Sequence, residues 1–115
     1  MGQWLTAIFL PDIGADYNWL SVSAGFAHTI AMRTDGSLWA WGWNNWGQVG
    51  NDTNIDRYVP TRIRADINWA LVSAGNGHSM AICSNGTLWA WGNNYDGQLG
   101  DGTQVNRSTP VQILP

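Results

Sequence analysis

The sequence contains no lysine and no glutamate, and its five arginines and eight aspartates leave a net charge of −3. Proteins that bind DNA or RNA through phosphates need clustered basic side chains. This balance gives no such footprint, and it also argues against an anionic membrane surface. No apolar run approaches the roughly 20 residues of a membrane-spanning helix. We therefore expect neither nucleic-acid nor membrane partners.

Cysteine is nearly absent as well. Cys83 stands alone, so it cannot form a disulfide within the chain or share a metal with a second thiol. Its place in an alternating apolar segment predicts a plain buried thiol. The sequence leaves the cellular compartment open.

Nine tryptophans and fourteen glycines are the unusual abundances. Glycine, asparagine, aspartate, serine and threonine fill the polar positions, which favours turns and β-structure. No ten-residue stretch shows a helical period, so we predict an all-β fold.

The chain repeats itself after fifty residues, without a gap from Asp16 to Pro110. The segment Leu38–Gly42, for example, returns as Leu88–Gly92. We predict a leading strand and linker over residues 1–15, a first repeat over 16–65 and a second over 66–115. The repeated structural positions are Gly25, His28, Gly36, Trp39, Trp41, Gly42, Gly47 and Gln48, which return as Gly75, His78, Gly86, Trp89, Trp91, Gly92, Gly97 and Gln98.

Each repeat is predicted to be a meander of four short antiparallel strands. The Asp35-Gly36 and Asn85-Gly86 pairs predict two-residue type I′ hairpin turns. A fourth strand is expected to begin after each of Pro60 and Pro110, and Leu5–Leu10 looks like another copy of that strand. Four strands at a period of fifty residues are typical of a β-propeller blade.

The order Ala-Gly-x-x-His, then Asp/Asn-Gly-x-Leu-Trp-x-Trp-Gly-x-Asn, then Gly-Gln-Leu/Val-Gly, resembles the regulator of chromosome condensation repeat. The resemblance covers residues 16 to 115. It implies blades of a seven-bladed propeller. It also implies two kinds of activity known in the family, namely guanine nucleotide exchange on a small GTPase and binding of protein partners.

Two repeats are fewer than seven, and a lone pair of blades leaves strand edges and sheet faces open. We expect copies of the chain to complete a ring as a homo-oligomer. Because blades join head to tail and each chain supplies two, a trimer would give six blades and a tetramer eight.

The two histidines occur once per repeat, too few to gather the three or four ligands of a zinc site. We expect each to hydrogen-bond a neighbouring loop, and we expect no metal and no cofactor. Trp39 and Trp41, with their counterparts, point to one sheet face and should fill the space between blades. Trp43 and Trp46 are not repeated, so with Tyr95 they are the candidate binding residues for a protein or glycan. Packing over the next blade is the alternative.

A plant photoreceptor of the family absorbs through a Gly-Trp-Arg-His motif. Those positions here hold Gly25-Phe26-Ala27-His28 and Gly75-Asn76-Gly77-His78, which excludes photoreception by that motif. No constellation of catalytic residues appears. We predict a non-catalytic, tryptophan-rich scaffold module that self-assembles and presents loops to a protein or carbohydrate. Nucleotide exchange, by resemblance, and an excised or engineered propeller fragment without a partner are the alternatives.

Overall fold

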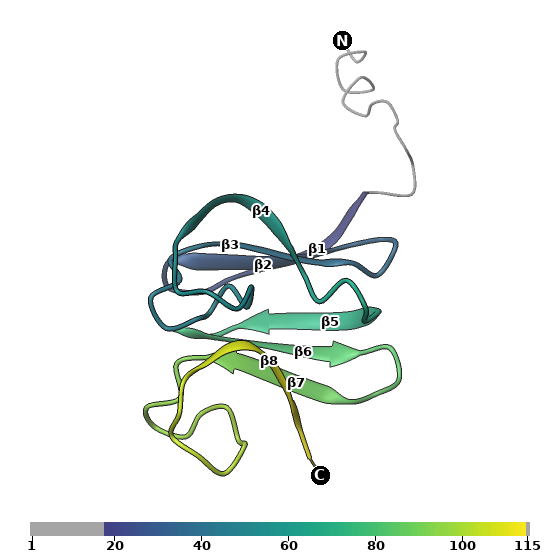
Figure 1. Cartoon of the computed structure of the whole chain (residues 1–115). Coiled ribbons are helices and arrows are strands. Elements are labelled where there is room, and N and C mark those ends of the chain that lie inside the picture. Colours follow the sequence, from purple (N-terminus) through teal and green to yellow (C-terminus); the bar gives the residue numbers. More distant parts are fainter. Residues whose placement is uncertain (1–17, 115) are drawn as a thin grey trace.

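The computed structural model describes residues 18–114 and contains two four-stranded antiparallel sheets (Figure 1). The first has the strand order β1 (Trp19–Ala24), β2 (His28–Arg33), β3 (Leu38–Gly42) and β4 (Arg57–Ile63). The second has the order β5 (Trp69–Ala74), β6 (His78–Cys83), β7 (Leu88–Gly92) and β8 (Arg107–Ile113). The predicted all-β class and the two four-stranded blades are confirmed. The leading strand predicted at Leu5–Leu10 lies outside the described residues.

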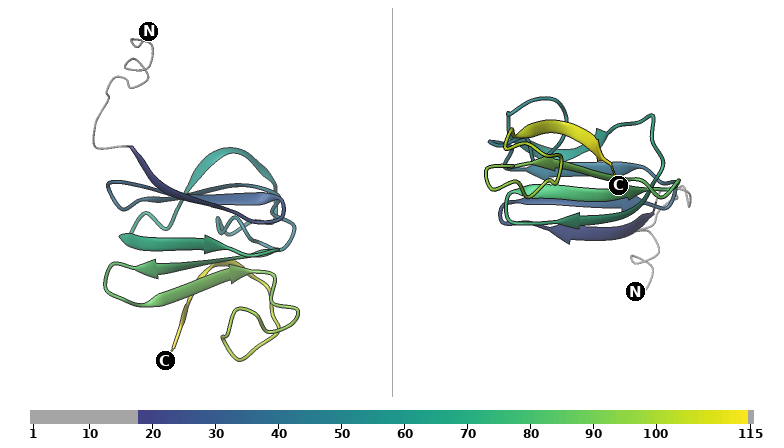
Figure 2. Two further views of the ribbon diagram at one scale, coloured as in Figure 1. Left: turned by 180° about the vertical axis from the view of Figure 1, so that it is seen from behind. Right: turned by 90° about the horizontal axis from the view of Figure 1, so that it is seen from below.

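The two sheets stack face to face, as the views in Figure 1 and Figure 2 agree. Strand β5 of the second blade lies against β1 and β2 of the first. No helix among residues 18–114 has the length and apolar character to cross a membrane.

The hairpins between β2 and β3, and between β6 and β7, differ from the predicted type I′ turn. Gly36 and Gly86 have φ of 84° and 90°, whereas Asp35 and Asn85 are not among the residues of positive φ. The Gly36 N–H donates to the carbonyl of Arg33, and the Arg33 N–H to the carbonyl of Ser37. This is the three-residue hairpin loop, in which a left-handed glycine follows an ordinary turn. Asp35 accepts hydrogen bonds from the backbone and hydroxyl of Ser37, so its side chain stabilises this conformation.

The fourth strands begin earlier than predicted. Strand β4 starts at Arg57 and contains Pro60, and β8 starts at Arg107 and contains Pro110. The prediction that they begin after the prolines is wrong. Both are edge strands of their sheets, and the register of each shifts beside the proline. An edge or a bulge leaves a backbone N–H unused, so proline is tolerated there.

The core lies between the sheets and follows from strand alternation. His28, Ile30 and Met32 of β2 are buried towards the second blade, and Ser79, Ala81 and Cys83 of β6 are buried towards the first. Leu38, Ala40, Val49, Ile63, Trp69 and Trp91 complete this cluster. Each blade therefore has two unlike faces, and one face of each is buried in the core.

Candidate binding surfaces

A short polar seam crosses the junction between the blades. His28 Nε2 lies 2.9 Å from the Ser79 hydroxyl, which donates to the carbonyl of Gln48 at 2.8 Å. The same carbonyl accepts from Trp91 Nε1 at 2.9 Å. The partner of His28 is therefore a strand residue of the next blade rather than the loop that the sequence predicts. These bonds fix the two sheets in one register.

Buried asparagines organise the long loop after β3 and after β7. Asn44 is fully buried, and its Nδ2 donates to the carbonyls of Thr53 and Ile55 while its Oδ1 accepts from Val49 N. Asn94 makes the same bonds fifty residues later. Sequence analysis did not single out this pair, although its recurrence was the available signal. The two loops are thus held rigidly and can position surface residues.

Trp43 and Trp46 meet on the first of these loops, with ring centroids 4.7 Å apart. Phe26 from the β1–β2 corner adds an edge contact to Trp43 at 6.3 Å and is itself 75% exposed. The Trp46 ring lies directly over Gly77 of the second blade. We call Phe26, Trp43 and Trp46 the aromatic cluster. It spans the junction of the blades, where Trp46 packs over the next blade. Its role in binding stays a prediction.

Tyr95 does not join this cluster. It is 76% exposed, and its backbone is fixed by Asn93 Oδ1 and Gln104 Nε2. Phe26 takes the third place instead. Phe26 is not among the predicted binding residues, although its repeat partner is Asn76 and this departure from the repeat, as at Trp43 and Trp46, is the signal that could have identified it.

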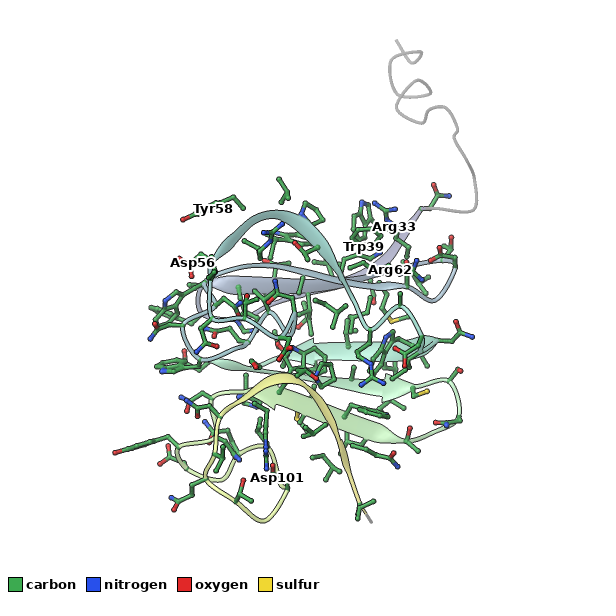
Figure 3. The ribbon with its side chains drawn as sticks, in the orientation of Figure 1. Arg33, Trp39, Asp56, Tyr58, Arg62 and Asp101 are labelled. Carbon is green, nitrogen blue, oxygen red and sulfur yellow. The ribbon has the colours of Figure 1, made fainter. Side chains whose placement is uncertain are left out.

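The outer face of the first blade is aromatic and cationic. Trp19 packs edge-on against Trp39 and Trp41, at 6.3 and 6.1 Å between centroids. The Arg33 guanidinium lies 4.5 Å from the Trp19 ring centre and 4.3 Å from that of Trp39. Figure 3 shows Arg33, Trp39 and Arg62 on the side of the first sheet that points away from the second. We call Trp19, Arg33, Trp39 and Trp41 the tryptophan face.

The outer face of the second blade is aliphatic. A hollow of about 320 Å³ opens there, and it is lined by Leu71, Val72, Ser73, Met80, Ala81, Ile82 and Leu88. We call Met80, Ile82 and Leu88 the aliphatic face. The outer faces of the two blades therefore present surfaces of different chemistry.

Charged groups on the loops are paired locally. The Thr103 hydroxyl and the Arg107 guanidinium, 2.8 Å away, hold the pKa of Asp101 below its usual range (Figure 3). The Arg64 guanidinium lowers the pKa of exposed Asp66 to about 2. Within residues 18–114 no three His, Cys, Asp or Glu side chains lie close enough to hold a metal. These carboxylates serve loop structure, and the candidate surfaces are the aromatic cluster and the two outer faces.

Two sequence models of the regulator of chromosome condensation (RCC1) repeat match the chain. One covers residues 35–82 and 85–115, and the other covers residues 19–48 and 69–98. The chain is also similar to the ultraviolet-B receptor UVR8 of Arabidopsis thaliana, with 46% identity over 43 residues. That match covers 37% of this chain and 10% of the receptor.

Solved structures of complete propellers contain the same arrangement of blades. Human WBSCR16 superposes with a TM-score of 0.80 at 23% identity, over 90% of this chain and 27% of that one. Prp20p of Saccharomyces cerevisiae, described with its binding to Gsp1p and histones, superposes with a TM-score of 0.78 at 24% identity and the same coverage. The chain thus spans about a quarter of these propellers, and the likeness concerns their fold.

Proposed function

Since the chain belongs to the regulator of chromosome condensation (RCC1) repeat family, we propose that it is a non-catalytic binding module. Its aromatic cluster contacts a protein partner. The observation that carries this proposal is the convergence of exposed Phe26 with the half-buried Trp43 and Trp46 at one spot on the surface. Exposed aromatic side chains on rigid loops are the residue type that anchors protein interfaces.

A protein fits this cluster better than a glycan. The rings of Trp43 and Trp46 are inclined at 52° to each other, so they form a wedge rather than one flat platform for a sugar ring. A wedge receives an apolar side chain from a partner. Binding of Gsp1p and histones by Prp20p is consistent with a protein ligand for this fold.

The test pans a phage library of random peptides against the immobilised chain and then titrates a synthetic consensus peptide in solution. We expect Trp43→Ser to weaken peptide binding by more than roughly tenfold, as loss of an anchoring aromatic does. Tyr95→Ser is the control, because Tyr95 is an exposed aromatic residue on the corresponding loop of the second blade but lies outside the cluster. Peptides that bind both variants like the wild type, or a chain that binds only a glycan array, would contradict the proposal.

We also propose that copies of the chain assemble with one another through their two outer faces, towards a ring of six or eight blades. The support is that one face is rich in tryptophan and the other is aliphatic, and that they lie at opposite ends of the stacked sheets. Repeat proteins bury such faces only against further repeats.

A further inference from the structure

The junction inside the chain provides a template for a junction between chains. Its polar seam joins His28 and the carbonyl of Gln48 on the first blade to Ser79 and Trp91 on the second. Shifted by fifty residues, the first-blade partners become His78 and Gln98. These two lie on the blade whose aliphatic face is open.

The other half of the seam is present at the opposite end. Thr29 stands where Ser79 stands and carries a hydroxyl, and Trp41 stands where Trp91 stands and carries an indole N–H. Both residues are partly exposed, and neither group has a hydrogen-bond partner among residues 18–114. The two outer faces therefore carry one matching set of donors and acceptors.

A glycine on the second blade, Gly100, leaves room for this contact. A Cβ on Gly50 would lie 2.6 Å from Trp91 Nε1, because that indole packs against the glycine backbone. A Cβ on its counterpart Gly100 would meet only a methyl group of Ile113 at 3.7 Å. The Trp91 indole fills the space over Gly50 inside the chain, whereas the corresponding space over Gly100 is open.

Burial shows the same difference on both apolar faces. Trp69 is 3% exposed inside the junction, whereas its counterpart Trp19 is 47% exposed. Met32 and Leu38 are fully buried, whereas their counterparts Ile82 and Leu88 line the open hollow. The residues exposed on the two outer faces are thus the repeat counterparts of residues that the internal junction buries.

Each of the two junctions, the one inside the chain and the one between chains, would contain one arginine beside its tryptophans. Inside the chain, Arg64 of the first blade lies 5.3 Å from the ring centre of Trp89, and Cys83 holds the position that corresponds to Arg33. On the tryptophan face, Arg33 replaces the cysteine and itself covers Trp39. The counterpart of Arg64 is Leu114, which is exposed. A second copy would therefore bring a leucine towards Arg33 and no second positive charge.

We propose that the tryptophan face of one copy binds the aliphatic face of a second copy, in the register of the junction inside the chain. This inference rests on the proposed self-assembly and specifies its contacts. His78 and Gln98 of the second copy meet Thr29 and Trp41 of the first. Because the two faces differ, the contact is head to tail and leaves one face free on each outer chain, so growth continues until a ring closes.

The test measures mass by sedimentation as a function of concentration for the 115-residue chain and for variants of each face. Val22→Asp places a charge beside the tryptophan face, where the counterpart Val72 packs on the core. Ile82→Asp places one on the aliphatic face. Val105→Asp is the control, because its counterpart Ile55 stays 69% exposed beside the second blade. We expect each face variant to weaken association by more than roughly tenfold, with the control unchanged.

Mixing provides the decisive measurement. The Val22→Asp chain keeps an intact aliphatic face and the Ile82→Asp chain an intact tryptophan face, so together they should form a one-to-one dimer that grows no further. Thr29→Val removes the hydroxyl with little change of shape and should weaken assembly even if an aspartate variant misfolds. Circular dichroism and thermal unfolding report whether each variant folds.

Each outcome separates this inference from the proposals on which it rests. A wild-type chain that stays monomeric at about 1 mM overturns the inference and the self-assembly together, while peptide binding by the aromatic cluster stands. Association that persists in both aspartate variants and in Thr29→Val overturns the contact between the tryptophan face and the aliphatic face, and self-assembly then uses another surface. Folded face variants that remain monomeric when mixed overturn the head-to-tail arrangement.

Discussion

Ser79 fixes the protonation of His28 across the junction of the blades. Its hydroxyl has one proton, which it donates to the carbonyl of Gln48. The oxygen therefore accepts from His28, so Nε2 of the imidazole carries the proton and Nδ1, buried and unpartnered, does not. Burial lowers the pKa of His28 to about 4. A neutral imidazole is thus part of the junction.

The first prediction is a loss of stability in mild acid. The pKa of His28 is lower in the folded chain than the ordinary value of 6.5, so the unfolded chain takes up a proton first as the pH falls. The free energy of unfolding should be constant above pH 6.5 and fall by roughly 3 kcal/mol between pH 6.5 and 4. Urea titrations across this range measure it.

His28→Gln should remove most of the pH dependence of the free energy of unfolding. His78→Gln should retain most of it, because of the two histidines only His28 is buried in the junction. Asp66 and Asp101 do not interfere, since their pKa values are lowered and they lose their stabilising charge only below pH 4. An unchanged slope in His28→Gln would assign the acid sensitivity to another group.

The second prediction concerns the loop asparagines. Asn44→Ala removes a fully buried amide that bonds two loop carbonyls and the buried N–H of Val49, and alanine cannot replace these bonds. We expect a loss of about 2–4 kcal/mol in the free energy of unfolding. Asn45→Ala, one residue away and exposed, should cost less than about 0.5 kcal/mol. Equal costs for the two variants would show that the network does not hold the loop.

The sequence predicted the fold because the fifty-residue period and the alternation along strands are local signals. The predicted meander of four strands in each repeat agrees with the two sheets. The turn at Gly36 was wrong because the Asp-Gly pair fits two loop types, and the Ser37 contact that selects one of them is a tertiary detail. The start of β4 was wrong because only the sheet order reveals that Pro60 lies on an edge.

The candidate surfaces were only partly visible in the sequence. Departure from the repeat pointed to Trp43 and Trp46, which do meet. Tyr95 was predicted with them because it lies on the corresponding loop of the second repeat. It does not join the cluster, and the position of a residue along a loop does not reveal which way its side chain faces. Phe26 joins from a corner seventeen residues before Trp43. The two residues meet because β2 pairs with β3, which sets His28 opposite Gly42 and lets Trp43 N donate to the carbonyl of Ala27.

The third prediction concerns the support of the aromatic cluster. Gly77 has no positive φ, so alanine is compatible with its backbone, but the added Cβ would meet the outer edge of the Trp46 ring. We expect Gly77→Ala to displace Trp46 and expose it, with a red shift of the tryptophan emission and a stability loss of only about 1 kcal/mol, since the ring is at the surface. In a Trp46→Ala background the same substitution should be nearly silent. A full stability cost in that background would mean that Gly77 matters for another reason.

The fourth prediction compares two glycines of the same conformation. Gly50 and Gly100 have φ of 90° and 80°, so alanine brings a similar backbone strain of about 1 kcal/mol to each. Only at Gly50 does the Cβ also collide with a buried indole, that of Trp91. Gly50→Ala should therefore cost at least about 1 kcal/mol more than Gly100→Ala in urea unfolding of the monomeric chain.

For assembly between chains we expect Gly100→Ala, rather than Gly50→Ala, to be the damaging substitution. If Trp41 of a second copy packs over Gly100 as Trp91 packs over Gly50, then Gly100→Ala blocks that site while the monomer remains folded. Sedimentation should show weaker association of folded Gly100→Ala chains. Because one substitution tests the internal junction and its counterpart tests the external one, association of Gly100→Ala at wild-type strength would show that the indole does not enter this space.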